Sequence, residues 1–330
     1  MKKIFALLLS AALLVTLLAA CGGGNTTDTD TDTQEPAADP STTQVEEQEP
    51  DTGDASKDDP LNQDEIGEKE LLVVSFGTSY NDSRRETIGA IEKAMQTAFP
   101  DYSVRRAFTS QIIIDHVKDR DGVTIDNVEQ ALERAVDNGV KTLVVQPTHL
   151  MNGLEYKELT DELAKYSDSF EKIAIGDPLL TSDADFEAVM TAITDATKDA
   201  ADGKTAICFM GHGTTADSNS VYSKMQTLLT DKGFNDYYVG TVEATPSLDD
   251  VLAAVQKGNY EKVILRPLMI VAGDHANNDM AGDEDDSWKS TFEKAGYTVD
   301  CQVEGLGQLE AIQQLFVEHA KAAVASAEAE

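Results

Sequence analysis

Short apolar runs alternate with amphipathic stretches from residue 70 onward, and this alternation constrains the fold more than any other feature of the sequence. Four of the runs read LLVV, TLVV, AICFM and KVIL, which is typical of strands that are buried on both faces. Helical patterns lie between the runs, for example over residues 84–98 and 183–200. Strands that alternate with helices in this way predict an α/β fold, in which helices cover parallel sheets.

The second half of this region repeats the order of the first half. Its segment GHGTT takes the place of SFGTS, and RPLMIVAGDH takes the place of QPTHLMNG. We therefore expect two similar lobes, residues 70–200 and 201–330, with a cleft between them. In open parallel sheets, ligands bind beyond the carboxyl ends of the strands. The residues that follow each predicted strand are thus the first candidates for a site.

The N-terminus has the pattern of a bacterial export signal. Lys2 and Lys3 precede the apolar run FALLLSAALLVTLLAA, which is short for a membrane-spanning helix. The residues from Leu18 to Cys21 then resemble a lipobox, so residues 1–21 are predicted to be a lipoprotein signal peptide that leaves Cys21 lipidated. A secretory signal with an incidental cysteine is the alternative. The predicted location is extracytoplasmic, with lipid anchoring to the bacterial cell membrane.

Residues 22–69 contain almost no large apolar side chains and consist mainly of Thr, Asp, Glu, Gln, Pro and Gly. Such a segment buries too little surface to offset the entropy of ordering it, so it is predicted to be a disordered acidic tether. The whole chain has 60 acidic and 26 basic side chains, a formal net charge of -34. This balance argues against nucleic acid as a partner, because phosphate binding depends on clustered Lys and Arg.

Three of the five histidines follow predicted strands: His149, His212 and His275. The other two, His116 and His319, lie in helical patterns and are predicted to be surface residues. Glu243 ends the predicted strand YYVGTVE, in the same half as His212 and His275. Two imidazoles and one carboxylate are a suitable open ligand set for a divalent first-row metal ion. A single histidine after a strand is more often structural, which keeps that alternative open.

Two other groups of residues invite a chemical interpretation. Cys208 and Cys301 lie in apolar strand-like runs and are predicted to be inert buried thiols, although the sequence leaves a disulfide open. The acidic run from Asp279 to Asp286 suggests metal loading, but we expect it to cap the helix that contains Trp288. No P-loop pattern is present in the sequence, so no nucleotide cofactor is expected.

Several longer motifs resemble one family. They read VVSFGTSYNDSRRETIGAIE, RRAFTSQIII, QPTHLMNGLEY, FMGHGT, VGTVEATP and LMIVAGDHANNDMAGDEDDSWK, with GLGQ near the end. Together they resemble the anaerobic sirohydrochlorin cobaltochelatases of the CbiK type, over roughly residues 70–325. The resemblance implies two Rossmann-like lobes of the class II chelatase kind. It also implies insertion of Co²⁺, as substrate metal, into sirohydrochlorin or its reduced precursor precorrin-2 in anaerobic cobalamin biosynthesis.

The resemblance also implies roles for particular residues. The histidine of the GHG motif, here His212, is the general base and a metal ligand, and Glu243 and His275 complete the metal site. Glu155, in the NGLEY segment, is implied to lie near the cleft, and His149 is a weaker candidate there. A neutral imidazole suits this reaction, because it accepts a proton near pH 7 and also binds metal through nitrogen.

The substrate implied by the resemblance carries eight carboxylates, so cations are expected to face the cleft. Adjacent arginine pairs are the candidates for carboxylate clamps: Arg84 with Arg85, and Arg105 with Arg106. The tetrapyrrole is the expected partner, and a second copy of the chain is compatible with the sequence. Two alternatives stay open: a lipoprotein that binds tetrapyrrole, haem or metal and feeds a transporter, and a chelatase that prefers iron or nickel.

Overall fold

The strands form two parallel sheets with the same strand order. A computed structural model describes residues 52–329. One sheet has the order β2-β1-β3-β4 and the other β6-β5-β7-β8, so β1 and β5 each lie next to the strand that follows and to the one after it. The first comprises β1 (Lys69–Ser75), β2 (Ser103–Phe108), β3 (Thr142–Pro147) and β4 (Lys172–Ile175). The second comprises β5 (Thr205–Gly211), β6 (Tyr237–Thr241), β7 (Lys262–Pro267) and β8 (Thr298–Cys301).

Helices connect the parallel strands of the first sheet. They are α1 (Asn81–Glu86), α2 (Ile88–Ala98), α3 (Gln111–Asp121), α4 (Val128–Asp137) and α5 (Leu154–Ala164), with a short 3₁₀ turn, η1 (Ala55–Lys57), before β1. The helix predicted over residues 84–98 is in fact two helices, because the backbone breaks at Thr87. That residue is both the C-cap of α1 and the N-cap of α2.

The second sheet is connected in the same way. Its helices are α7 (Ser220–Asp231), α8 (Leu248–Val255) and α9 (Trp288–Lys294), with the short turns η3 (Asp217–Asn219) and η5 (Leu306–Gln308). A π-helical turn, η4 (Ala276–Met280), follows β7. Single π turns are rare and occur often at functional sites. The predicted α/β fold with two similar parallel-sheet lobes is confirmed.

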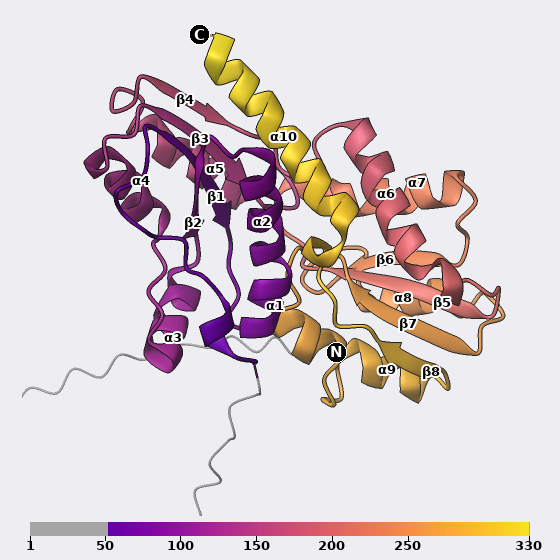
Figure 1. Ribbon diagram of the computed structural model, residues 1–330. Helices are drawn as coiled ribbons and strands as arrows, with labels where there is room; N and C mark the ends of the chain where they lie inside the picture. The colour runs from indigo at the N-terminus through magenta and orange to yellow at the C-terminus, as the bar shows by residue number, and fades with distance from the viewer. Residues whose placement is uncertain (1–51, 330) are drawn as a thin grey trace, which may run out of the picture. The chain divides into compact units, whose positions relative to one another are not determined.

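The predicted boundary at residue 200 does not separate the helices of the two lobes. The last helix, α10 (Glu310–Ala329), lies alongside β3, β4 and α2 of the first lobe (Figure 1). The helix α6 (Asp183–Thr197), followed by η2 (Lys198–Ala200), packs against both α10 and α7. One continuous apolar core therefore includes side chains of both lobes, such as Val73, Phe209 and Phe316. Amphipathic pattern alone does not show which of two sheets a helix covers.

Residues 52–68, which were predicted to belong to the tether, pack against the first lobe. Leu61 is buried in the core, and its carbonyl accepts a hydrogen bond from the backbone N–H of Arg106. The side chain of Asp58 is also buried, against two arginines. The predicted end of the tether at residue 69 is therefore wrong. The predicted signal peptide, Cys21 and the rest of the tether, up to residue 51, lie outside the described residues.

Within residues 52–329, no helix combines the length and the apolar character needed to cross a membrane.

Candidate functional site

The first feature of the site is the turn Gly211–His212–Gly213 at the carboxyl end of β5. A Cβ atom on Gly211 would lie 2.1 Å from the ring of Tyr222, so no larger residue fits there. Gly213 has a φ of +89°, and a Cβ atom on it would lie 2.9 Å from the backbone nitrogen of Ala244. The two glycines thus bring the backbone around His212 close to α7 on one side and to the next strand's loop on the other.

Glu243 is brought to His212 by strand pairing that continues beyond the sheet. The N–H of Val242 donates to the carbonyl of Gly211, and the N–H of Glu243 donates to the carbonyl of His212, each at 2.9 Å. The parallel register pairs Gly211 with Thr241, so the residues after these two strands stay side by side.

His275 arrives from the other neighbour of β5. It follows β7 and a short loop, and it is the N-cap residue of η4. Its Nδ1 lies 2.7 Å from a carboxylate oxygen of Asp279, one turn further along the chain. The loop before it contacts the first lobe, because the N–H of Ala272 donates to the hydroxyl of Ser83 at 3.0 Å.

The three side chains converge. His212, Glu243 and His275 each offer one ligand atom, and these atoms lie within 4.8 Å of one another. Nε2 of His212 is 4.0 Å from Oε1 of Glu243, and the two imidazole rings meet edge to face at 4.6 Å between centroids. Between 33% and 57% of each side chain is exposed. Two nitrogens and one carboxylate at an open surface can hold a metal ion while leaving coordination positions free for a substrate.

The first lobe contributes a half-buried histidine and an exposed glutamate. Burial lowers the pKa of His149 to about 4, although the negative charge of Glu155 opposes this shift, so the imidazole is neutral at pH 7. Neither ring nitrogen of His149 has a hydrogen-bond partner among the described residues. Glu155 lies in the first turn of α5, beside a cavity of about 360 Å³ whose lining includes Gly153 and Ser218, one from each lobe. Neither residue joins the converging trio.

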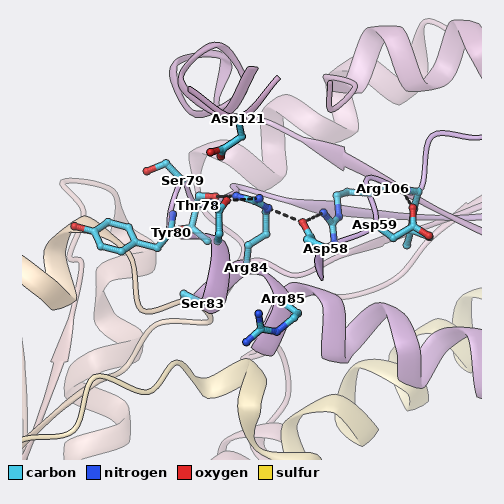
Figure 2. A network of polar contacts seen from close by, with 12 residues as sticks. Asp58, Asp59, Thr78, Ser79, Tyr80, Ser83, Arg84, Arg85, Arg106 and Asp121 are labelled. Atoms are coloured by element: carbon cyan, nitrogen blue, oxygen red, sulfur yellow. Dashed lines mark hydrogen bonds and ion pairs between the residues drawn. The ribbon is translucent and has the colours of Figure 1, made fainter. Parts of the chain in front are cut away.

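Three of the four arginines predicted to clamp substrate carboxylates are buried instead. Figure 2 shows Asp58 between the guanidinium groups of Arg84 and Arg106. Asp58 Oδ2 lies 2.6 Å from Nε of Arg84 and 2.7 Å from Nη1 of Arg106, which also binds Glu92 at 2.7 Å. Burial alone would raise the pKa of Asp58, but the hydrogen bonds and charges of the two arginines lower it overall. These guanidinium groups are therefore held internally, and their prediction as clamps was wrong.

Arg105 is buried like Arg84 and Arg106, whereas Arg85 is partly exposed. Only 1% of the Arg105 side chain is exposed, and its nearest carboxylate oxygen, on Asp126, is 3.6 Å away, so it too is no clamp. Arg85 has 30% of its side chain exposed and pairs with Asp82 and Glu86 on the same helix. A strand sends adjacent side chains to opposite faces, yet here both faces of β2 are covered. Arg85 stays a predicted substrate-binding residue.

Other predicted residues have structural roles. Ser287, not the acidic run, caps α9, because its side chain accepts the N–H of Ser290. His319 is mostly buried and lies 3.0 Å from Asp185, so its prediction as a surface residue was wrong. Cys208 and Cys301 are free thiols, on strands separated by β7. Burial raises the pKa of both, that of Cys301 to about 11, which agrees with inert thiols.

Sequence reasoning missed two carboxylates that the structure places in key positions. Asp279 was read as part of a capping run, although its spacing of four residues from His275 is the signal for a contact on one helical face. Asp58 was read as part of the tether. The local signals were Leu61 and Ile66, two isolated large apolar residues in a polar segment.

Known proteins resemble this chain over most of its folded part. A family model described as cobalt chelatase (CbiK) matches residues 69–325. The sirohydrochlorin cobaltochelatase of Salmonella typhimurium is 38% identical over 251 residues, which are 76% of this chain and 94% of that protein. The sirohydrochlorin cobaltochelatase CbiKC of Nitratidesulfovibrio vulgaris is 30% identical over 260 residues, which are 78% of this chain and 91% of that protein.

A solved structure shares the fold at low sequence identity. SirB from Bacillus subtilis with Fe³⁺ superimposes with a TM-score of 0.57 at 14% identity, and the match covers 80% of this chain and 98% of that one. At this identity the likeness concerns the fold alone. The match of the family model and the identity to the two relatives extend over most of the sequence. The chain therefore belongs to the CbiK family of cobalt chelatases.

Proposed function

We propose that this protein is a sirohydrochlorin cobaltochelatase of cobalamin biosynthesis, which inserts Co²⁺ into sirohydrochlorin. The relatives named above carry this activity in their names. In the reaction one Co²⁺ ion replaces two pyrrole N–H protons of the macrocycle, so two protons leave as four Co–N bonds form. The observation that carries the proposal is the open trio of His212, Glu243 and His275.

The hydrogen bond of His212 sets which of its nitrogens can react. Its Nδ1 lies 2.7 Å from the carbonyl oxygen of Gly213. A carbonyl oxygen only accepts hydrogen bonds, so Nδ1 carries the proton in the neutral ring and Nε2 carries the lone pair. That lone pair lies on the side of Glu243. His212 is thus prepared to hold the incoming metal ion or to accept a pyrrole proton, and the carboxylate of Glu243 offsets the charge of either cation.

The trio is also incomplete, which suits a site that must release its metal. Three ligands on an exposed surface leave positions for the macrocycle nitrogens, whereas a closed four-ligand site would retain the ion. Each ligand comes from the end of a different strand or its loop. The sheet therefore fixes the spacing of the ligands without enclosing the ion.

The test is insertion of Co²⁺ into sirohydrochlorin by the purified protein, followed by the absorbance change of the macrocycle. We expect His212→Ala to lose at least about 100-fold in rate, as for loss of a general base, while its fold and Tm are unchanged. The matched control is His116→Ala, an exposed histidine on α3. A wild-type protein that binds the tetrapyrrole tightly but inserts no metal would instead favour the transporter-feeding lipoprotein. Faster insertion of iron or nickel than of cobalt would overturn the choice of metal.

We also propose that Cys21 carries lipid and that the protein is anchored on the outer side of the bacterial cell membrane. The motif from Leu18 to Cys21 supports this, as does the scarcity of large apolar residues between it and residue 52. Membrane fractionation of cells that express the wild type and Cys21→Ala provides the test. We expect the wild type in the detergent-soluble membrane fraction and a shift of the variant out of it. Equal fractionation of the two proteins argues against the anchor.

A further inference from the structure

The two histidines of the trio are held by different kinds of acceptor. Nδ1 of His212 faces the carbonyl of Gly213, which is neutral, and Nδ1 of His275 faces the carboxylate of Asp279, which is charged. Both contacts are 2.7 Å long. Asp279 itself is outside the trio of ligand atoms. The difference between the acceptors has a chemical consequence that the trio alone does not reveal.

The contact with Asp279 fixes the orientation of His275. An ionised carboxylate only accepts hydrogen bonds, so Nδ1 of His275 donates to it and Nε2 holds the lone pair. Without this contact the ring is free to rotate about its χ2 bond or to move its proton to the other nitrogen. A carboxylate behind a metal-binding histidine is a common arrangement, because it fixes the tautomer and strengthens the nitrogen as a ligand.

The turn η4 holds Asp279 in the right place. Its first and last residues, Ala276 and Met280, are fully buried in the core of the second lobe. His275 precedes Ala276, and Asp279 precedes Met280. Both side chains are partly exposed to solvent and lie on the same side of the turn. The side-chain amide of Asn277 donates to the carbonyl of Gly273 at 2.8 Å, which ties the turn to the preceding loop.

We propose that Asp279 is a positioning residue for metal binding. Through its contact with His275, it makes His275 the imidazole that retains Co²⁺ longer, while His212 dissociates from the ion first. This inference rests on the proposed function, in which the ion must pass from the protein to the macrocycle. A ligand backed by a carboxylate holds the ion more strongly than a ligand backed by a carbonyl.

The first measurement is Co²⁺ affinity in the absence of tetrapyrrole, by titration of the full-length protein with CoCl₂ and detection of Co²⁺ absorption. We expect Asp279→Ala to weaken Co²⁺ binding about 10- to 100-fold, the usual effect of losing such a partner. Asp279→Asn is expected to recover part of the loss, because its amide oxygen still accepts from Nδ1. The matched control is Asp283→Ala, which removes an exposed carboxylate paired with Lys289 and should leave the affinity unchanged.

The second measurement separates positioning from general damage. In the insertion assay, Asp279→Ala should raise the KM for Co²⁺ by a similar factor and leave kcat at saturating Co²⁺ within about threefold of wild type, whereas His212→Ala should lower kcat. Far-UV circular dichroism and Tm establish that each variant is folded. If Asp279→Ala binds Co²⁺ as tightly as wild type, the positioning role is overturned. If the wild type binds Co²⁺ but inserts none, the proposed function fails while the affinity comparison still decides the role of Asp279.

Discussion

The two lobes have the same strand order, yet they use polar residues in opposite ways. In the second lobe, His212, Glu243 and His275 stand exposed at the carboxyl ends of the strands and converge on one point. In the first lobe, Arg84 and Arg106 point inward and are held by carboxylates, and His149 has buried ring nitrogens and is neutral at pH 7. The comparison shows that two lobes with the same strand order can have different roles. In the second lobe these polar side chains are exposed and can bind a metal ion. In the first lobe the arginines are buried in ion pairs, and these pairs form the framework of the lobe.

The buried ion pairs of the first lobe are connected to the metal-binding trio through α1. Asp58 holds Arg84, and Arg84 in turn donates to the carbonyl of Thr78 at 3.1 Å (Figure 2). One residue before Arg84, the hydroxyl of Ser83 accepts the N–H of Ala272, in the loop that carries His275. The segment that begins at residue 52 therefore supports the surface against which the second lobe's site is built.

The largest expected effect tests whether this closed network is the framework of the first lobe. Asp58→Ala leaves Arg84 and Arg106 buried with one carboxylate fewer, and loss of one partner from a buried ion pair costs about 3–5 kcal/mol. We expect the free energy of unfolding, measured with urea, to fall by this amount. The control is Lys57→Ala, the neighbouring residue, whose side chain is 63% exposed. If both variants lose only about 0.5 kcal/mol, typical of surface positions, the contrast between the lobes fails.

Much of this arrangement is readable in the sequence, and the exceptions have physical reasons. The strands were predictable because buried parallel strands are apolar on both faces, as TLVV and AICFM are. The convergence of His212 and His275 followed from their positions after neighbouring strands. The burial of Arg105 and Arg106 did not follow, because a charged pair in a strand suggests an exposed face unless its partners are known. One partner, Asp58, lies about fifty residues away in a segment whose composition is that of a tether.

The next largest effect concerns Glu70, a buried residue of the first lobe that differs from Arg84 and Arg106. Its carboxylate is buried at the start of β1 without a hydrogen-bond partner among the described residues. Burial raises its pKa to about 7, despite the opposing charge of Arg105. A carboxyl whose pKa is raised on folding stabilises most below its unfolded pKa, near 4.3, and this contribution disappears as the pH rises through 7.

We therefore expect the effect of Glu70→Gln on the free energy of unfolding to depend on pH. Relative to wild type, the variant should gain about 3 kcal/mol in the free energy of unfolding between pH 4 and pH 8, because groups common to both proteins cancel. Urea unfolding at pH 4, 6 and 8 measures this difference. Glu68→Gln, at a side chain that is 69% exposed, should follow wild type at every pH. Parallel pH curves for Glu70→Gln and wild type would mean that the buried carboxylate is compensated after all.

The smallest expected effect concerns the position in the first lobe that corresponds to His212. Phe76 follows β1 as His212 follows β5, and each is followed by a glycine with positive φ, +103° at Gly77 and +89° at Gly213. Half of the Phe76 side chain is exposed, which is unusual for a large apolar residue beside a buried sheet. An apolar ring at this position suits the flat face of a macrocycle, as an imidazole suits its metal.

Phe76→Ala should thus weaken tetrapyrrole binding and leave metal binding intact. Covering part of a phenylalanine ring contributes about 1–2 kcal/mol, so the KM for sirohydrochlorin should rise about tenfold. Co²⁺ affinity in the absence of tetrapyrrole should be unchanged. The control is Ile112→Ala, which replaces another exposed large apolar residue, on α3, that is 82% exposed. If Phe76→Ala leaves the KM for sirohydrochlorin unaltered, the repeated turn is retained for folding alone, and substrate contact belongs to other parts of the lobes. A tenfold rise confined to this KM would instead show that both copies of the turn serve the reaction, one for the macrocycle and one for the ion.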